Sequence, residues 1–247
     1  EKIPFLVIGK GSNCLFDDKG FDGAVILNKI DFIDTSTPGL FHVGAGYSFS
    51  LLGVQTARDG WSGLEFASGI PASVGGAVFM NAGANGTETC KTIVSVDFVH
   101  PDGTFQTFEK KDLHFAYRES SFQKMRGAIV SALFSLEKVP TARQKQLEII
   151  NYRMKTQPYK DKSAGCIFRN PPGKFAGQLI EQSGLKGSAQ GGAQVSDMHA
   201  NFIVNKGHAT SEEVLQLIEQ IQNKVKMDSG ENLVSEVRII PYQMEPL

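Results

Sequence analysis

The sequence predicts an α+β protein with two halves. Strand-like runs and one clear hairpin make up most of the first half, whereas strands alternate with amphipathic helices in the second. Pro140 separates the last strand of the first half from a helical segment, and we place the boundary there. At 247 residues, the chain is long enough for one large domain or two modest ones with their own cores.

Composition and charge exclude several classes of protein. Hydrophobic residues make up 41% and charged residues 21%, as in a globular chain and unlike a disordered one. The formal net charge of −1 gives no electrostatic footprint for binding nucleic acid or a membrane surface. No apolar run is long enough to span a bilayer, and no signal peptide is apparent. The chain opens at Glu1 directly before a strand, so we expect an upstream segment.

The cysteines indicate a reducing compartment. Cys14, Cys90 and Cys166 are odd in number and irregularly spaced, with neither a CxxC motif nor a zinc pattern. We therefore expect free thiols in a cytosolic protein, with no metal centre.

Periodicity and turn residues predict the elements of the first half. A helix is expected over residues 48–59, with Ser48 as N-cap and Gly60 just beyond its end. Asp102-Gly103 predicts a β-hairpin between residues 92 and 108. Further strands are expected at residues 3–8 (buried), 15–16, 24–27, 41–46 and 127–136.

Two longer helices and two strands are predicted for the second half. The first helix covers residues 141–156, with Leu147, Ile150 and Met154 on one face. The second begins at a capping box formed by Thr210 and Glu213, ends at Gly230, and turns Val214, Leu217, Ile218, Ile221 and Val225 inward.

A short helix over residues 175–183, stopped by Gly184, and a strand over 202–205 lie between the two longer helices. A final strand over residues 234–240 would place Glu236 and Arg238 opposite Val237 and Ile239.

Many of the 26 glycines cluster in two places where backbone could approach a ligand. Residues 9–13 (Gly-Lys-Gly-Ser-Asn) follow a strand and could offer N–H groups to a phosphate, although a purely structural turn fits equally well. Residues 61–84 are almost all small or apolar. They could form a buried helix–loop pair, or a floor for a large flat ligand contacted by N–H groups of residues 69–76 and by Asn81. We favour the ligand floor because glycines at this density weaken an element that serves only packing.

The third candidate segment is residues 163–171, Ser-Ala-Gly-Cys-Ile-Phe-Arg-Asn-Pro. The small Ala-Gly pair allows close approach to Cys166. The thiol can donate a proton, attack as a nucleophile, or simply fill space as a buried, inert cysteine.

Seven stretches of the chain match one family together and in order. They are residues 9–13, 63–83, 117–120, 163–171, 191–196, 199–202 and 236–238. With these stretches the chain resembles the UDP-N-acetylenolpyruvoylglucosamine reductase family, and the resemblance covers essentially the whole chain. The segment between Tyr117 and Cys166 is too short for the extra loop that carries a substrate-covering tyrosine in the longer subtype, so the chain resembles the compact, type II form.

The resemblance implies a flavoprotein with two domains. Residues 1–138 would be an FAD-binding domain of the vanillyl-alcohol-oxidase (PCMH) type, truncated at its N-terminal end, and residues 139–247 an α/β substrate-binding domain. The residues implied to hold FAD are Gly9, Lys10, Gly11, Ser12, Asn13, Gly69, Ile70, Pro71, Ser73, Gly75, Gly76, Asn81 and Ala82.

The resemblance also implies a reaction. NADPH would reduce FAD, and flavin N5 would pass the hydride to C3 of UDP-N-acetylglucosamine enolpyruvate, giving UDP-N-acetylmuramate for bacterial peptidoglycan. The enzyme would be a cytoplasmic oxidoreductase of cell-wall biogenesis, a monomer, with no nucleic-acid or membrane partner and no metal. The residues implied to contact the substrate are Tyr117, Arg118, Lys155, Arg169 and Asn170.

The catalytic residues implied by the family are Arg118, Glu236 and Cys166. Arg118 and Glu236 would stabilise the negative charge that develops on the substrate. Cys166 would protonate C2, at a position where serine is commoner in the family. A thiol, with a reference pKa of about 8.5, is the better acid. Without the family context, Arg118 would more often be a surface arginine and Glu236 an ion-pair partner of Arg238.

Two other functions remain open on the sequence alone. One is a flavin-dependent oxidase of the same fold, and the other is a protein that stores or senses flavin without catalysis. Neither of them requires Arg118, Cys166 and Glu236 together.

Overall fold

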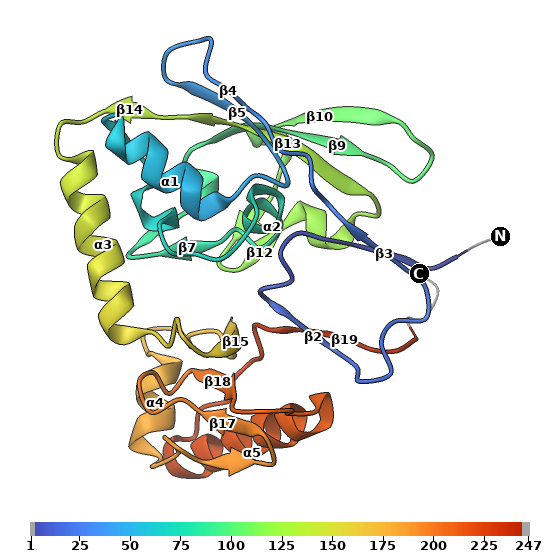
Figure 1. Cartoon of the computed structure of the whole chain (residues 1–247), viewed down its shortest axis with the longest axis vertical. Coiled ribbons are helices and arrows are strands. Elements are labelled where there is room, and N and C mark those ends of the chain that lie inside the picture. The colour runs from blue at the N-terminus through green and yellow to red at the C-terminus, as the bar shows by residue number, and fades with distance from the viewer. Residues whose placement is uncertain (1–2, 244–247) are drawn as a thin grey trace. The chain divides into compact units, whose positions relative to one another are not determined.

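A computed structural model describes residues 3–243, which form two compact units (Figure 1). The larger unit comprises Leu6–Lys10 and Val25–Arg153. The described part of the smaller unit comprises residues 3–5, 11–24 and 154–243. Helix α3 (Ala142–Thr156) runs across the division at Arg153, and the functional division after residue 138 stays a prediction.

An antiparallel sheet of five strands is the framework of the larger unit. Its strands follow the order β10-β9-β13-β5-β4. The sheet confirms the strand predicted near residues 41–46, the long strand before residue 136, and the hairpin at Asp102-Gly103, where Gly103 has a φ of +87°. The strand bounds are β4 Ile33–Asp34, β5 Leu40–Gly44, β9 Ile93–Val99, β10 Phe105–Glu109 and β13 Ala128–Ser135.

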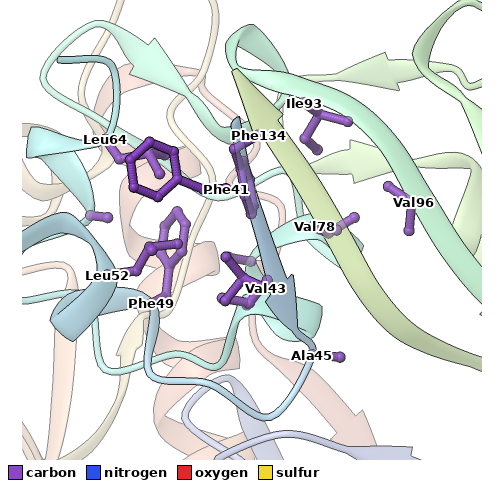
Figure 2. Packing of buried hydrophobic residues seen from close by; sticks show 14 of the residues in the cluster. Phe41, Val43, Ala45, Phe49, Leu52, Leu64, Val78, Ile93, Val96 and Phe134 are labelled. Atoms are coloured by element: carbon purple, nitrogen blue, oxygen red, sulfur yellow. The ribbon is translucent and has the colours of Figure 1, made fainter. Parts of the chain in front are cut away.

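One face of this sheet packs on two helices, and Figure 2 shows the core between them. Phe41 and Val43 of β5 and Phe134 of β13 lie against helix α1 (Phe49–Arg58), which contributes Phe49 and Leu52. All five side chains are at most 5% exposed. Because burying a large apolar side chain stabilises a fold by roughly 1.5–3 kcal/mol, this cluster fixes α1 on the sheet.

The predicted ends of helix α1 are confirmed. The Ser48 hydroxyl accepts a hydrogen bond from the backbone N–H of Leu51, and Gly60 has a φ of +79° just beyond the helix. The other short elements of the larger unit are β6 Trp61–Ser62, η1 Glu65–Ala67, α2 Val74–Phe79, β7 Gly83–Ala84, β8 Thr87–Glu88, η2 Thr89–Lys91, η3 Lys110–Asp112, β11 Phe115–Ala116, β12 Glu119–Ser120, η4 Ser121–Lys124 and β14 Glu137–Lys138. Two-stranded sheets also occur in this unit: β6 with β14, β7 with β8, and β11 with β12.

The smaller unit is a four-stranded antiparallel sheet, in the order β15-β18-β17-β16, with helices packed against it (Figure 1). The capping box of α5 is present, and Gly230 ends that helix with a φ of +74°. Leu217, Ile218, Ile221 and Val225 are buried, as predicted. The elements are β2 Cys14–Phe16, β15 Lys162–Cys166, α4 Ala176–Gln182, β16 Ala189–Gln190, β17 Ala193–Val195, β18 Phe202–Asn205, α5 Ser211–Ser229 and β19 Arg238–Ile240.

The predicted strand at the start of the chain is less buried than expected. Strand β1 (Phe5–Ile8) pairs with β3 (Ala24–Leu27), but of residues 3–8 only Leu6 is buried. All four residues of β3 are exposed. An apolar run therefore predicted the strand and overstated its burial. Among the residues that the structure describes, no helix is long and apolar enough to cross a membrane.

The buried face of α3 differs from the predicted one. Leu147 and Met154 are 42% and 63% exposed. Polar residues can occupy the buried face because they have partners: Gln146 Oε1 accepts a hydrogen bond from Arg143, and Arg153 Nη2 donates to the carbonyl of Gly69 at 3.4 Å. The buried residues of α3 are Ala142, Gln146, Ile149 and Arg153.

The final strand is shorter than predicted and does not alternate. Only Arg238–Ile240 forms β19, which runs parallel to β2. Val237 is buried whereas Ile239 is 47% exposed, so these two side chains do not share a buried face. The reason is that the chain before β19 bridges the segment after Cys166, at the Phe168–Ser235 bridge, before it joins β2.

Asp97 on the polar face of the larger sheet makes fold stability depend on pH. Burial raises the pKa of its carboxyl, but hydrogen bonds from Ser131 (2.5 Å), Thr107 (2.6 Å) and His42 (3.1 Å) outweigh that effect and lower the pKa below its ordinary value. A carboxyl with a lowered pKa stabilises the fold above its unfolded pKa of about 3.9 and loses that contribution as the pH falls through the folded value.

We therefore expect Asp97→Asn to reduce stability near neutral pH and to flatten the loss of stability between about pH 5 and pH 2. Urea unfolding followed by circular dichroism at several pH values measures this. Asp31→Asn, which removes an exposed carboxylate, is the control. Equal pH slopes for the wild type and Asp97→Asn would contradict the role given to Asp97.

Candidate functional site

The turn at residues 9–13 presents a run of unused backbone donors. In the described part of the chain, the N–H groups of these five residues have no hydrogen-bond acceptor. Gly11 adopts a φ of +68°, which suits glycine. Successive N–H groups around such a residue form the concave arrangement that binds anions, including phosphates. The chain passes from the larger to the smaller unit between Lys10 and Gly11.

Within the larger unit, Gly9 and Lys10 lie against the N-terminal ends of two helices. Lys10 Nζ donates to Ser48 Oγ at 2.9 Å, and Ser48 bridges Ser73, the N-cap of α2. A Cβ on Gly9 would lie 2.0 Å from Ser73 Oγ. The absence of a side chain at Gly9 is therefore a steric requirement of its close approach to Ser73 in the second glycine-rich segment.

The second glycine-rich segment differs from its prediction, because its N–H groups are largely used within the protein. The N–H of Gly69 donates to Ser50 Oγ (2.7 Å), and that of Gly75 donates to the Ala45 carbonyl (2.8 Å). The N–H groups of Ile70, Ala72, Val74 and Gly76 also have acceptors in the larger unit. These hydrogen bonds close the turn and begin α2. The expectation that this run would offer its N–H groups to a ligand is therefore not met.

One polar atom of that segment is left without a partner. Ser68 is fully buried, and its hydroxyl has no hydrogen-bond partner among the described residues. An unpaired buried hydroxyl costs free energy unless a bound molecule pairs with it. This orphaned group lies directly before Gly69, where the sequence predicted a ligand floor.

Asn81 is a positioning residue in this structure. It is fully buried with a φ of +42°, and its side-chain Nδ2 donates to Glu88 Oε2 (3.1 Å) and to the Ala116 carbonyl (2.9 Å). Its Oδ1 accepts from the N–H of Cys90 at 3.0 Å. Both amide hydrogens and the oxygen are thus occupied, so the side chain holds neighbouring segments in place.

Tyr117 and Arg118 form the loop of the β11–β12 hairpin. Ala116 pairs with Glu119, which leaves these two residues between the strands. Arg118 has a φ of +59°, and its guanidinium carbon lies 5.0 Å from the centre of the Tyr117 ring, a cation–π arrangement.

In the smaller unit, Cys166 ends strand β15, where the chain leaves regular pairing. Cys166 lies opposite Phe202 of β18, after an irregularity in the ladder and after Gly165, which has a φ of +78°. The side-chain amide of the buried Asn201 holds the next residues through two hydrogen bonds. Its Oδ1 accepts from the Phe168 N–H (3.0 Å), and its Nδ2 donates to the Phe168 carbonyl (2.8 Å).

Glu236 is bound by its backbone to the same place. Its N–H donates to the Ile167 carbonyl at 2.7 Å, and its own carbonyl accepts from Asn13 Nδ2 at 3.2 Å. The Asn13 carbonyl in turn accepts from the Arg238 N–H at 3.0 Å. Three segments far apart in the sequence, around residues 13, 166 and 236, therefore converge within the smaller unit.

The remaining predicted substrate residues lie in the smaller unit with different surroundings. Arg169 has a buried Nε without a hydrogen-bond partner among the described residues. Asn170 is exposed, and its Oδ1 accepts from the N–H of Ala176 at the start of α4 (3.0 Å). Lys155 is exposed near the end of α3. Asn201 lies in the matching stretch at residues 199–202, but the sequence predicts no role for it, because a hydrogen bond across 33 positions leaves no local signal.

Comparison with known proteins defines the class first. The family model of an FAD-binding domain matches residues 1–109. A second family model, described as "UDP-N-acetylenolpyruvoylglucosamine reductase, C-terminal domain", matches residues 157–240. The fold is that of an FAD-dependent oxidoreductase.

Relatives then define the family. UDP-N-acetylenolpyruvoylglucosamine reductase of Protochlamydia amoebophila is 61% identical over 99% of this chain and 82% of its own length. That of Chlamydia felis is 48% identical over the same shares of the two chains. The crystal structure of the reductase from Thermus caldophilus superposes with a TM-score of 0.85, at 38% identity, over 97% of this chain and 86% of that chain. The chain belongs to the UDP-N-acetylenolpyruvoylglucosamine reductase family.

The residues present fit FAD. The unused N–H groups of residues 9–13 suit a pyrophosphate, and the orphaned Ser68 hydroxyl offers a polar contact in the second glycine-rich segment. Within the larger unit, Gly9 lies against Ser73 of that second segment.

We expect Gly9→Ala to lower flavin content, because the added Cβ would overlap Ser73 Oγ and displace the turn. Gly9→Ala combined with Ser73→Ala should recover part of it, since the nearest remaining side-chain contact is then Ser73 Cβ at 3.0 Å. The ratio of flavin to protein absorbance measures both. Ser135→Ala, an exposed substitution in β13, is the control. Full flavin content in the Gly9→Ala single variant would contradict the steric argument.

Proposed function

We propose that the protein catalyses the NADPH-dependent reduction of UDP-N-acetylglucosamine enolpyruvate to UDP-N-acetylmuramate, in bacterial peptidoglycan synthesis. FAD, when bound, would supply the hydride chemistry between NADPH and C3 of the enolpyruvyl group. The reaction belongs in the cytoplasm and the protein acts as a monomer. Residues 1–138 form the flavin domain and residues 139–247 the substrate domain.

The observation that carries the proposal is the convergence around residues 13, 166 and 236 in the smaller unit. Cys166 and Glu236 are connected through one backbone hydrogen bond, between the Ile167 carbonyl and the Glu236 N–H. An acid that protonates C2 and a carboxylic group that stabilises developing charge must be held near each other. The proposal gives the first role to Cys166 and the second to Glu236.

Cys166 acts as a general acid. After hydride delivery the substrate carries negative charge at C2 and its carboxylate, and the thiol proton moves from Sγ to C2. A thiol is suited to this step because its reference pKa of about 8.5 keeps it protonated near neutral pH while allowing ready release. Gly165, directly before Cys166, has a positive φ and no Cβ.

Arg118 stabilises the same developing charge as a fixed cation. Its side chain is partly buried and lies over Tyr117, which restricts its freedom. A cation held in advance costs little reorganisation when charge develops. This role rests on the match of Tyr117 to Ser120 with the family motif.

Substrate binding uses cationic and amide side chains. Arg169 suits the diphosphate because its buried Nε has no hydrogen-bond partner in the described part of the chain, and an anion would satisfy it. Tyr117, Lys155 and Asn170 complete the proposed set. The proposed flavin contacts are the N–H groups of residues 9–13 and, by packing rather than through the N–H groups already used, the segment from Gly69 to Ala82.

Two substitutions at one position test the proposal. Cys166→Ala should leave flavin reduction by NADPH nearly unchanged and slow reoxidation by the enolpyruvyl substrate by about 100-fold or more, the usual contribution of a general acid. Cys166→Ser should retain much of the activity, because a hydroxyl can occupy the same place. Anaerobic stopped-flow measurement of the flavin spectrum separates the two half-reactions.

Normal substrate reduction by Cys166→Ala would refute the acid role. Rapid reoxidation of the wild type by air alone, without a response to the enolpyruvyl substrate, would instead support an oxidase.

A further inference from the structure

Arg118 occupies a backbone conformation that disfavours a side chain. In the two-residue loop of the β11–β12 hairpin, Arg118 has a φ of +59°, whereas Tyr117 is not among the residues with positive φ. Such a turn usually places glycine or asparagine at this position. A residue held there despite the steric cost requires support from its surroundings, and such strain often marks functional positions.

The support comes from Gln123. Its Nε2 donates to the Arg118 carbonyl at 3.0 Å and to the Phe79 carbonyl at 3.0 Å. A third acceptor, Met80 Sδ, lies farther from Nε2, at 3.7 Å. A primary amide nitrogen carries two hydrogens, and the two nearer carbonyl oxygens are the stronger acceptors for them. Because these neighbours are acceptors, the amide must present nitrogen rather than oxygen here. The side chain therefore connects the strained residue to the end of α2.

Gln123 is itself firmly held. The preceding residue, Phe122, is 1% exposed and stacks on Phe98 of β9 with ring centres 5.6 Å apart. Ser120 Oγ donates to the same Phe79 carbonyl at 2.6 Å. Gln123 is thus held by the core of the sheet and by the end of α2, and its side chain in turn holds the carbonyl of Arg118. All of these residues belong to the larger unit.

We propose that Gln123 is a positioning residue for Arg118. Its amide fixes the Arg118 carbonyl in the left-handed turn and thereby sets the direction in which the guanidinium leaves the backbone. The inference rests on the proposed charge-stabilising role of Arg118. A displacement of about 1 Å at a catalytic group can reduce a rate by about 100-fold. Loss of the hydrogen bond from Gln123 to Arg118 is therefore enough to slow substrate reduction.

A simpler role for Gln123 would be to satisfy the last carbonyl of α2, without any effect on Arg118. The two roles differ in coupling. A purely structural glutamine contributes independently of the residue at position 118, whereas a positioning residue loses its effect on catalysis once the arginine is gone.

The experiment is a double-mutant cycle with Gln123→Met, which keeps side-chain length and removes both donors, and Arg118→Ala. The rate measured is anaerobic reoxidation of NADPH-reduced protein by the enolpyruvyl substrate in a single turnover, followed for hours where slow. Gln123→Met should slow this step by about 10- to 100-fold, and flavin reduction by NADPH by less than about twofold. In the Arg118→Ala background, Gln123→Met should change the substrate step by less than about twofold.

Ser120→Ala is the matched control, because it removes the other hydrogen bond to the Phe79 carbonyl without touching Arg118. It should lower the midpoint of thermal unfolding as Gln123→Met does, yet slow the substrate step less. Should Gln123→Met yield no folded flavoprotein, Gln123→Glu replaces it, since an ionised carboxylate also lacks donors.

Equal slowing by Gln123→Met in both backgrounds, or no slowing in the wild-type background, would overturn the inference. If Arg118→Ala itself retained the wild-type rate, the proposed role of Arg118 would fail. The two failures are therefore distinguishable.

Discussion

The hydrogen bonds that tie the segment after Cys166 to the segment around Glu236 are the constraint on which the smaller unit depends. The Ile167 carbonyl accepts from the Glu236 N–H, and the Phe168–Ser235 bridge continues the contact. The Asn13 side chain donates to the Glu236 carbonyl, and the Asn13 carbonyl accepts from the Arg238 N–H. These are mainly backbone interactions, which persist when side chains change. Sulfur or oxygen can therefore occupy position 166 without moving the frame around it.

The larger unit meets a different constraint, the close approach of glycine-rich backbone to helix ends. Gly9 lies where any side chain would overlap Ser73, and the second glycine-rich segment spends most of its N–H groups on its own turn and on α2. Among the described residues, the N–H groups of Gly9 and Lys10 and the Ser68 hydroxyl are donors of this unit without an acceptor. The second glycine-rich segment thus serves as a scaffold, and the turn that begins at Gly9 supplies hydrogen-bond donors.

Local patterns were enough to predict many elements of this fold. The capping box of α5, the Asp102-Gly103 hairpin and both ends of α1 depend on residues only a few positions apart. The buried face of α3 and the shortened final strand could not be predicted, because Gln146 and Arg153 are buried through partners and residue 235 pairs with Phe168. In the candidate site, three of the stretches matched in the sequence, around residues 13, 166 and 236, converge in the structure, and the roles of their residues stay predictions. The sequence predicted no role for Asn201 or Gln123, because their hydrogen bonds join residues from separate elements.

The pH dependence of substrate reduction tests the central claim, proton donation by Cys166, most directly. Single-turnover reoxidation of the reduced protein by the enolpyruvyl substrate would be measured across pH for the wild type and for Cys166→Ser. If the thiol is the acid, the wild-type rate falls as the thiol ionises, around pH 8.5 for an unperturbed cysteine, and the serine variant lacks this fall. The same basic limb in both proteins would contradict the account.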